Sequence, residues 1–424
     1  MGSETVVLPF REAVEVNPKV SLKSGTVYPF VEMKAIEPSR RNVSESEFRV
    51  AGGGSRFEPG DTLMARITPC LENGKVARYL PSAGIDGPAF GSTEFIVIRG
   101  RKGVTTDEFA YYLTKSPEFH SFAVAQMTGS SGRQRVPVEA FDKYLVEVPP
   151  IEEQKRIAHI LGTLDDKIEL NRQMNRTLEE MARALFKSWF VDFDPVRAKM
   201  SGRWTRTTPL PGLPGLPTSL FDLFPDHLVD SPLGEIPAGW SVGCLGDEFV
   251  ITMGQSPPGN TYNEIGEGVP FFQGRSDFGF RYPQNRVFCT SPTRFSEAGD
   301  TLVSVRAPVG DINMAFERCC VGRGVAAVRH RSGVTTYTYY KMASLKQVFM
   351  DFDREGTVFG AINKDAFNGL PSVVVPEPVL RSFEATVRSI EHRLGKNEIE
   401  SRWLTELRQE LIGHLMSGAR ALEA

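Results

Sequence analysis

The chain is poor in the residues that build disulfide, redox and metal sites. Its 424 residues include five cysteines, an odd number, and none of them forms a C-x-x-C pair. They are Cys70, Cys244, Cys289, Cys319 and Cys320. The six histidines are scattered, and none stands at the spacing of a zinc-ligating pair. We therefore expect reduced thiols, no metal site and no hydrolytic metal chemistry.

Long apolar runs and targeting signals are missing as well. No apolar stretch approaches the roughly 20 residues that a membrane-spanning helix requires. The N-terminal MGSETVVLPF has no charged segment followed by an apolar one, and Val6 stands where a myristoylation motif carries Ser or Thr. These absences predict a cytoplasmic protein with no membrane partner.

Positive charge is not in excess. The 49 Lys and Arg residues face 52 Asp and Glu residues, which gives a formal net charge of -3 at pH 7. A surface that binds nucleic acid would therefore have to be local. The net charge neither supports nor excludes DNA as a partner.

Motifs of enzymes that act on nucleotides or DNA are absent or incomplete. The chain has no G-x-x-x-x-G-K-[ST] loop for ATP. The segment at 322–327 fits G-x-G-x-x-A, but residues 325–330 are predicted to continue as a strand instead of opening a helix. The nearest match to the Pro-Pro-aromatic loop of base-flipping adenine methyltransferases is SPPG at 256–259, whose glycine cannot stack on a base. We predict a non-catalytic chain with no catalytic residue and no cofactor of its own.

One long amphipathic segment occurs twice. Between residues 151 and 190, apolar or small residues recur at alternating steps of four and three, the a/d spacing of a coiled-coil seam. Asn171 and Asn175 interrupt this seam, and an offset of 226 residues carries Asn171 onto Asn397 in a second seam. The first seam contains Ile157, Leu161, Leu164, Ile168, Leu178, Ala182, Leu185 and Trp189. The second contains Phe383, Val387, Ile390, Leu394, Ser401, Leu404, Arg408, Leu411 and Leu415. A single amphipathic helix is more often an ordinary core helix, but two matched seams predict two long antiparallel helices in a coiled coil.

The segments that precede the long helices are repeated too. GDTLMARITP at 60–69 is answered by GDTLVSVRAP at 299–308, and Phe141 and Phe367 are again 226 residues apart. In the first copy, β-branched and aromatic runs bounded by Gly and Pro predict strands at 27–31, 62–67, 95–98 and 144–148. Helices are predicted at 107–113 and 117–126. The fold class is therefore α/β (α+β), a pseudo-two-fold tandem repeat in which each mixed domain precedes a long helix.

The predicted parts are a domain at 1–150, a helix at 151–193, a linker at 194–239, a domain at 240–376 and a helix at 377–424. Within the linker, PLPGLPGLP at 209–217 cannot hold a ladder of backbone hydrogen bonds, so we expect an extended tether over the surface. The first helix ends in an aromatic run that could dock a partner, although a place in the core is favoured. This run is Phe186, Trp189, Phe190 and Phe193.

Polar and basic residues on glycine-rich loops are the candidate DNA-binding residues. Arg can bind guanine through two hydrogen bonds, Asn or Gln can bind adenine in the same way, and Lys mostly holds phosphate. The candidates in the first domain are Arg66, Lys75, Arg78, Arg133, Gln134 and Arg135. Those in the second domain are Arg275, Arg281, Arg286, Arg306, Arg323, Asn363 and Lys364. For any one of them a solvated surface role is the more frequent alternative, and only the clustering on loops favours DNA.

Four features together resemble one known family. They are VPPIEEQKRIAHIL at 148–161, SWFVDFDPV at 188–196, LGEIPAGW at 233–240 and the paired GDTL blocks. As an ensemble they resemble the specificity (S) subunit of type I restriction-modification enzymes over essentially the whole chain. One departure is that the first helix opens with Glu153 and Gln154, whereas the second reads VLRSF at 379–383. The two helix starts need not dock partners identically.

The resemblance implies a DNA-recognition subunit. Two target-recognition domains would each read one half of a bipartite site in double-stranded DNA, separated by helices about 60 Å long. The implied partners are two methyltransferase (M) subunits and restriction (R) subunits. These would carry adenine methylation and DNA cleavage, together with S-adenosylmethionine, ATP and Mg²⁺. Two other classes stay open, a self-contained DNA methyltransferase or nuclease and a coiled-coil adaptor that does not bind DNA.

Overall fold

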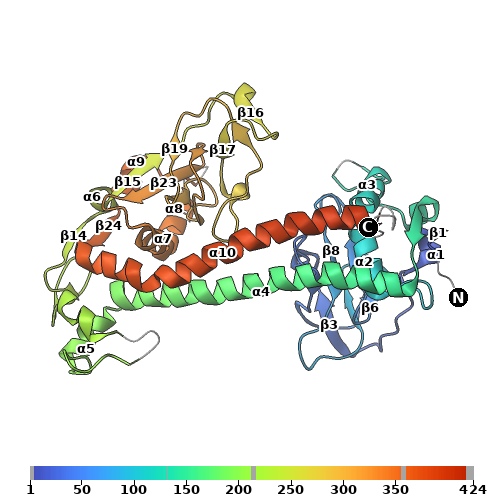
Figure 1. Cartoon of the computed structure of the whole chain (residues 1–424), viewed down its shortest axis with the longest axis horizontal. Coiled ribbons are helices and arrows are strands. Elements are labelled where there is room, and N and C mark those ends of the chain that lie inside the picture. The colour runs from blue at the N-terminus through green and yellow to red at the C-terminus, as the bar shows by residue number, and fades with distance from the viewer. Residues whose placement is uncertain (1–3, 131, 212–215, 355–359, 417–424) are drawn as a thin grey trace. The chain divides into compact units, whose positions relative to one another are not determined.

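The structure, a computed structural model, describes residues 4–130, 132–211, 216–354 and 360–416 (Figure 1). The chain divides into two compact units, one formed by residues up to 171 together with those from 399 onward, the other by residues 172–398. Each unit holds one β-rich head, part of helix α4 (Ile151–Phe190) and part of helix α10 (Glu377–Met416). The predicted mixed class with two heads and two long helices is confirmed.

The first head contains a five-stranded sheet in the order β2-β10-β7-β8-β4 and a four-stranded sheet in the order β5-β3-β9-β6. The five-stranded sheet consists of β2 (Val14–Val16), β10 (Phe95–Gly100), β7 (Thr62–Ala65), β8 (Val76–Tyr79) and β4 (Asn42–Val43). The four-stranded sheet consists of β5 (Glu47–Val50), β3 (Val27–Val31), β9 (Ala89–Gly91) and β6 (Ser55–Phe57). A separate pair joins β1 (Val6–Pro9) to β11 (Leu145–Val148). The helices are α1 (Phe10–Ala13), α2 (Asp107–Lys115) and α3 (Pro117–Ala125).

Strand β10 shows how these layers arise from the sequence. Its residues Phe95, Ile96, Val97 and Ile98 are all buried, and successive side chains of a strand point to opposite faces. Ile96 and Ile98 pack in the core that contains α2, whereas Phe95 and Val97 pack in the core that contains the second sheet. A strand covered on both faces needs an unbroken apolar run, and FIVI supplies it.

The second head repeats this layout, with sheets in the orders β15-β23-β20-β21 and β16-β18-β17-β22-β19. The first sheet consists of β15 (Phe249–Met253), β23 (Val325–His330), β20 (Thr301–Ser304) and β21 (Ile312–Met314). The second consists of β16 (Tyr262–Asn263), β18 (Phe288–Cys289), β17 (Val269–Phe272), β22 (Cys319–Val321) and β19 (Phe295–Ser296). Strand β14 (Ser241–Cys244) pairs with β24 (Pro371–Val374), as β1 pairs with β11. The helices are α6 (Leu245–Glu248), α7 (Thr335–Ser344), α8 (Lys346–Arg354) and α9 (Lys364–Asn368).

The aspartate of each GDTL block has the same structural role in the two heads. Asp61 accepts a hydrogen bond from the backbone N–H of Glu58 at 2.7 Å and pairs with Arg99 of β10 at 2.6 Å. Asp300 pairs with Arg329 of β23, also at 2.6 Å. Each aspartate therefore ties the turn before one strand to the neighbouring strand.

Helices α4 and α10 pack antiparallel against each other (Figure 1). In the first unit, Asp165 of α4 forms a buried ion pair with Arg408 of α10. Six residues further along α4, the Asn171 side chain donates a hydrogen bond to the Ser401 hydroxyl at 3.3 Å. Residue numbers rise along α4 as they fall along α10, so the predicted antiparallel pair is confirmed.

The second unit continues the same pairing. The Asn175 side chain donates a hydrogen bond to Glu398 at 2.8 Å and accepts one from Asn397 at 2.9 Å. Asn175 and Asn397 are both buried, so this hydrogen bond pairs the two side chains where water cannot reach them. The asparagines that interrupt the seam thus lie inside it.

The predicted seam positions are all at least partly buried. The buried ones are Ile157, Leu161, Ile168, Asn171, Asn175, Ala182, Leu185, Trp189, Phe383, Val387, Leu394, Asn397 and Arg408. The half-buried ones are Leu164, Leu178, Ile390, Leu404, Leu411 and Leu415. Near the end of α10, Ile412 and Met416 are more buried than Leu411 and Leu415, because this end packs on the core of the first head.

Residues 194–211 and 216–239 are folded, so the prediction of an extended surface tether is wrong for this described part of the linker. This segment forms α5 (Asp194–Met200), the short helix η3 (Thr218–Leu223) and the strand pair β12 (Leu228–Val229) and β13 (Ile236–Pro237). Trp204 and Phe224 are buried in the core of the second unit. Leu210 and Leu216 form a β-bridge on either side of residues 212–215, which lie outside the described residues. Burial of large apolar side chains outweighs the Pro and Gly content.

The aromatic run at the end of α4 lies in the same core. Phe186, Trp189, Phe190 and Phe193 are all buried there. Phe190 contacts Phe383 of α10 edge to face, with ring centroids 5.1 Å apart. The core alternative is therefore confirmed over a partner-docking edge.

Candidate nucleic-acid interface

In the first head, two predicted segments meet where β7 ends. Arg66 follows this strand, and its carbonyl oxygen accepts a hydrogen bond from the backbone N–H of Val136 at 3.0 Å. The Arg66 side chain donates to the Val136 carbonyl oxygen at 3.2 Å. The structure therefore brings Arg66 next to the segment that carries Arg133, Gln134 and Arg135.

The side chains of residues 133–135 differ in whether they form an ion pair within the head. Arg135 pairs with Glu94 at 2.6 Å, and this hydrogen bond lowers the pKa of Glu94. The backbone carbonyl of Gln134 accepts from the N–H of Thr68 at 3.0 Å, which fixes the loop. Arg133 is exposed and has no ion pair among the residues that the structure describes. Arg133 is thus the cation of this loop that no described acid neutralises, and the uncharged, partly buried Gln134 follows it.

Lys75 and Arg78 are bonded within the head. The Lys75 ammonium group donates to the Met33 carbonyl oxygen at 3.0 Å. Arg78 pairs with Glu108 of α2 at 2.9 Å. Arg78 also lies opposite Thr62, at the far end of β7 from Arg66. The structure separates Arg78 from the Arg66 cluster, whereas the Lys75 carbonyl oxygen accepts a hydrogen bond at 3.0 Å from the N–H of Ala65, the residue before Arg66. The role of Lys75 and Arg78 in DNA binding stays a prediction.

The second head has an equivalent edge after β20. Arg306 forms a β-bridge with Ala361, just as Ile67 does with Arg135 in the first head. Asn363 and Lys364 follow at the start of α9, where the Asn363 side chain accepts a hydrogen bond from the N–H of Ala366 at 2.8 Å. Arg306, Asn363 and Lys364 are all exposed.

Arg323 extends this edge. It follows β22 as Thr93 follows β9 in the first head, and its side chain lies 3.4 Å from the Ser256 hydroxyl. Arg275 and Arg286 are exposed but paired, Arg275 with Asp311 at 2.9 Å and Arg286 with Asp277. Among the candidate arginines of the second head, Arg306 after β20 and Arg323 after β22 are therefore the ones without an ion pair to a described acid.

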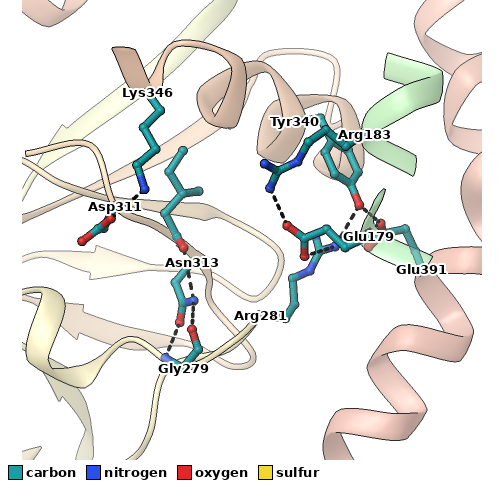
Figure 2. Close-up of polar contacts among 10 residues, drawn as sticks. Glu179, Arg183, Gly279, Arg281, Asp311, Asn313, Tyr340, Lys346 and Glu391 are labelled. Atoms are coloured by element: carbon teal, nitrogen blue, oxygen red, sulfur yellow. Dashed lines mark hydrogen bonds and ion pairs between the residues drawn. The ribbon is translucent and has the colours of Figure 1, made fainter. Parts of the chain in front are cut away.

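Arg281 is not a surface residue, so its prediction as a DNA contact is wrong. Its side chain is 0% exposed and lies between α4 and α10 within the second unit (Figure 2). It pairs with Glu179 and with Glu391 at 3.4 Å each, and stacks on the Tyr339 ring at 3.9 Å from the centroid. A basic residue on a glycine-containing loop is here a structural cation that bonds the head to the helices.

Arg41 occupies the equivalent position in the first head. The carbonyl oxygen of Arg41 accepts from the N–H of Arg78 in β8, and that of Arg281 accepts from the N–H of Met314 in β21. The Arg41 guanidinium donates to the carbonyl oxygen of Gly162 on α4 at 3.1 Å. One arginine from the same loop thus anchors each head to its helices.

A tyrosine accompanies each of these arginines. Tyr112 donates to Asp165 and Tyr340 donates to Glu391, both at 2.8 Å (Figure 2 for Tyr340). The offset of 226 residues carries Asp165 onto Glu391. Burial raises the pKa of both tyrosines, so each hydroxyl stays protonated and donates. The arginine and tyrosine contacts that hold each head on the long helices are therefore duplicated along with the fold.

Sequence comparison shows which known proteins this chain is similar to. Residues 63–180 match the family model described as type I restriction modification DNA specificity domain. The chain is similar to specificity subunits of type I restriction enzymes. It is 28% identical over 409 residues to the specificity subunit of the type I restriction enzyme HindI of Haemophilus influenzae, covering 85% of this chain and 87% of that one.

Further relatives of this family match in part or in fold. The EcoAI specificity subunit of Escherichia coli is 34% identical over 148 residues, covering 34% of this chain and 25% of that one. The crystal structure of a type I restriction-modification system S subunit from M. genitalium matches with a TM-score of 0.51 at 14% identity. That match covers 98% of this chain and 96% of the other, and it supports a shared fold.

Among the described residues, no three His, Cys, Asp or Glu side chains are grouped so that they could hold a metal ion. No helix in this part of the chain is both long and apolar enough to span a bilayer.

Proposed function

We propose that this chain is the DNA-reading subunit of a type I restriction-modification complex. In this proposal each head reads one half of a bipartite, asymmetric site in double-stranded DNA. The observation that carries this proposal is that the two heads share one backbone arrangement but present different side chains on it. The edge that holds Arg66 and residues 133–135 in the first head holds Arg306 and residues 361–364 in the second. Different donors on equivalent edges suit two unequal half-sites.

The helix pair sets the unread spacer in this proposal. Support comes from the way each head is bonded to its own part of the pair, through Arg41 on Gly162 in one unit and Arg281 on Glu179 and Glu391 in the other. Because each head is anchored to the long helices, the separation of the two half-sites would depend on the length of those helices.

Chemistry belongs to partner subunits in this proposal, and the chain itself is non-catalytic. Two methyltransferase subunits would methylate one adenine in each half-site, and restriction subunits would cleave DNA. S-adenosylmethionine, ATP and Mg²⁺ would bind to those partners. A purified chain that transferred methyl groups unaided would contradict this division.

Exchange of one head tests the proposal. Residues 1–148 are replaced with the corresponding residues of a relative, and the complex is expressed with its methyltransferase partner. Sequencing of methylated genomic DNA is expected to show a change in one half of the motif only. Replacing residues 240–376 is the matched control and should change the other half. A change in both halves from one exchange would contradict independent heads.

A further inference from the structure

The first head contains a cleft that is lined by cations and by no acid. Its volume is about 340 Å³, and its lining includes Lys19, Arg56 and Arg66 with Asn17 and Thr93. None of the lining residues is Asp or Glu. Lys19 and Arg56 are exposed, and neither has an ion pair within the described ranges of the chain. Arg66 interacts electrostatically with Glu94 beside the cleft, so Lys19 and Arg56 supply the positive charge that no acid of the lining compensates.

The three cations come from separate elements of the head. Lys19 follows β2, Arg56 lies in β6 and Arg66 follows β7. The Nε atom of Arg66 is buried and has no partner among the described residues. The Arg56 guanidinium donates to the Val20 carbonyl oxygen at 3.5 Å, the outer limit of a hydrogen bond. Both guanidinium groups keep N–H donors for an anion.

A neighbouring concavity of the same head provides a contrast. Lys34 and Arg49 line it, but so does Glu32. Glu32 pairs with Lys34 at 2.6 Å and with Arg49 at 3.3 Å, and the bond to Lys34 lowers the pKa of Glu32. Thr93 lines both hollows. Two adjacent sites therefore differ in whether their cations are already neutralised.

We propose that the cleft of Lys19, Arg56 and Arg66 holds one backbone phosphate of the half-site that the first head binds. This inference rests on the proposed function and deepens it. Three converging cations suit a phosphodiester oxygen, and lysine acts on phosphate as a point charge. A stacked base is disfavoured, because the aromatic residue in the lining, Phe95, is buried. The contact would position the DNA without reading its sequence.

The place of the cleft supports this assignment. Arg66 belongs to both the cleft and the edge that carries Arg133 and Gln134. A phosphate held at Arg66 would bring the adjoining bases toward that loop. The cleft would then fix the register in which Arg133 and Gln134 meet base edges.

Salt-dependent binding tests the inference. The full-length chain, assembled with its methyltransferase partner, carries Lys19→Gln and Arg56→Gln together. Binding is measured to a duplex with the methylated motif and to one with the motif scrambled. Affinity for both duplexes should fall by the same factor, about tenfold. The slope of log affinity against log salt should become shallower by about 0.9, because one phosphate contact is lost.

A variant with Lys34→Gln and Arg49→Gln is the matched control. It removes the same charges from the neutralised concavity and should leave affinity and slope near those of the wild type. If both double variants lost the same DNA affinity, the loss would reflect net charge and not this cleft, and the inference would be overturned. A loss confined to the motif duplex, with the slope unchanged, would make Lys19 and Arg56 base readers and overturn it too.

Failure of the proposed function would look different. A wild-type complex that bound the motif and scrambled duplexes equally would contradict specificity, whatever the variants did. Lys19 and Arg56 are exposed, so thermal unfolding should be unchanged by both substitutions. Unchanged DNA binding by this folded variant would overturn the phosphate site alone.

Discussion

Removing the guanidinium group of Arg281 should destabilise the second unit. Arg281 is 0% exposed and is the cation of Glu179 and Glu391, whose side chains are 12% and 17% exposed. Its Nη2 atom also donates to the Tyr340 hydroxyl at 2.9 Å (Figure 2). In Arg281→Met, a side chain of comparable length fills the space but leaves Glu391 without its cation, whereas Glu179 keeps its ion pair with Arg183 at 2.8 Å.

Three effects set the size of the loss. Removing one partner of a buried ion pair costs about 3–5 kcal/mol. Losing the stack on Tyr339 costs about 0.5–2 kcal/mol more. In the opposite direction, Nε and Nη1 of Arg281 are buried without a partner in the described structure, and their removal returns about 1–3 kcal/mol. The net expectation is a loss of about 2–4 kcal/mol in the free energy of unfolding.

Denaturant unfolding followed by circular dichroism measures this loss. Arg275→Met is the control, because Arg275 lies on the same loop but is exposed and should cost about 0–1 kcal/mol. The double variant Arg281→Met with Glu391→Gln should recover part of the stability, since one stranded carboxylate is gone. If Arg281→Met cost no more than Arg275→Met, or showed no coupling to Glu391, the role of Arg281 as a structural cation would be refuted.

Three further predictions follow from the helices and the second core. Asn175→Leu strands the buried Asn397 amide and should cost about 1–3 kcal/mol in chemical unfolding; Asn175→Leu with Asn397→Leu should recover it, and an equal loss in the double variant would contradict the pairing. Burial raises the pKa of Glu248 above its ordinary value of 4.5, so the folded protein holds a proton that the unfolded chain has released. Stability should therefore fall as pH rises from 4.5 through the folded pKa, and Glu248→Gln should remove this decline in Tm; a Gln variant with the wild-type pH profile would rule it out. One heptad inserted into each long helix at paired positions adds about 10 Å, so the methylated motif should gain about three spacer base pairs, whereas an unchanged motif would sink the spacer role.

Elements that depend on local apolar pattern could be predicted from sequence. Strands β3 and β23 have the predicted bounds, Val27–Val31 and Val325–His330. Helices α2 and α3 begin where predicted and end within two residues of the prediction. In each case β-branched runs, or a serine or threonine at the helix start, decide the structure without help from distant residues.

Contacts between distant residues could not be predicted in the same way. Arg281 and Arg275 look alike in sequence, and what distinguishes the buried Arg281 is its contacts with distant residues such as Glu179 and Glu391, the latter 110 residues further on. Residues 194–239 look like a tether by composition, yet Trp204 and Phe224 find a core whose other members are far along the chain. Lys19 and Arg56 stand in no motif, and only the order of strands brings them to one cleft.

The polar positions of the long helices explain why their register is unique. In one unit Asn171 contacts Ser401, which is the repeat equivalent of Asn175. In the other, Asn175 contacts Asn397, which is the repeat equivalent of Asn171. A slide by one heptad in either direction would place Asn175 opposite Leu404 or Ile390, and each stranded amide would cost about 1–3 kcal/mol. An apolar seam alone would tolerate such a slide, so the asparagines exchange some stability for a fixed alignment. In a subunit whose helices set the distance between half-sites, that alignment would fix which spacer the complex accepts.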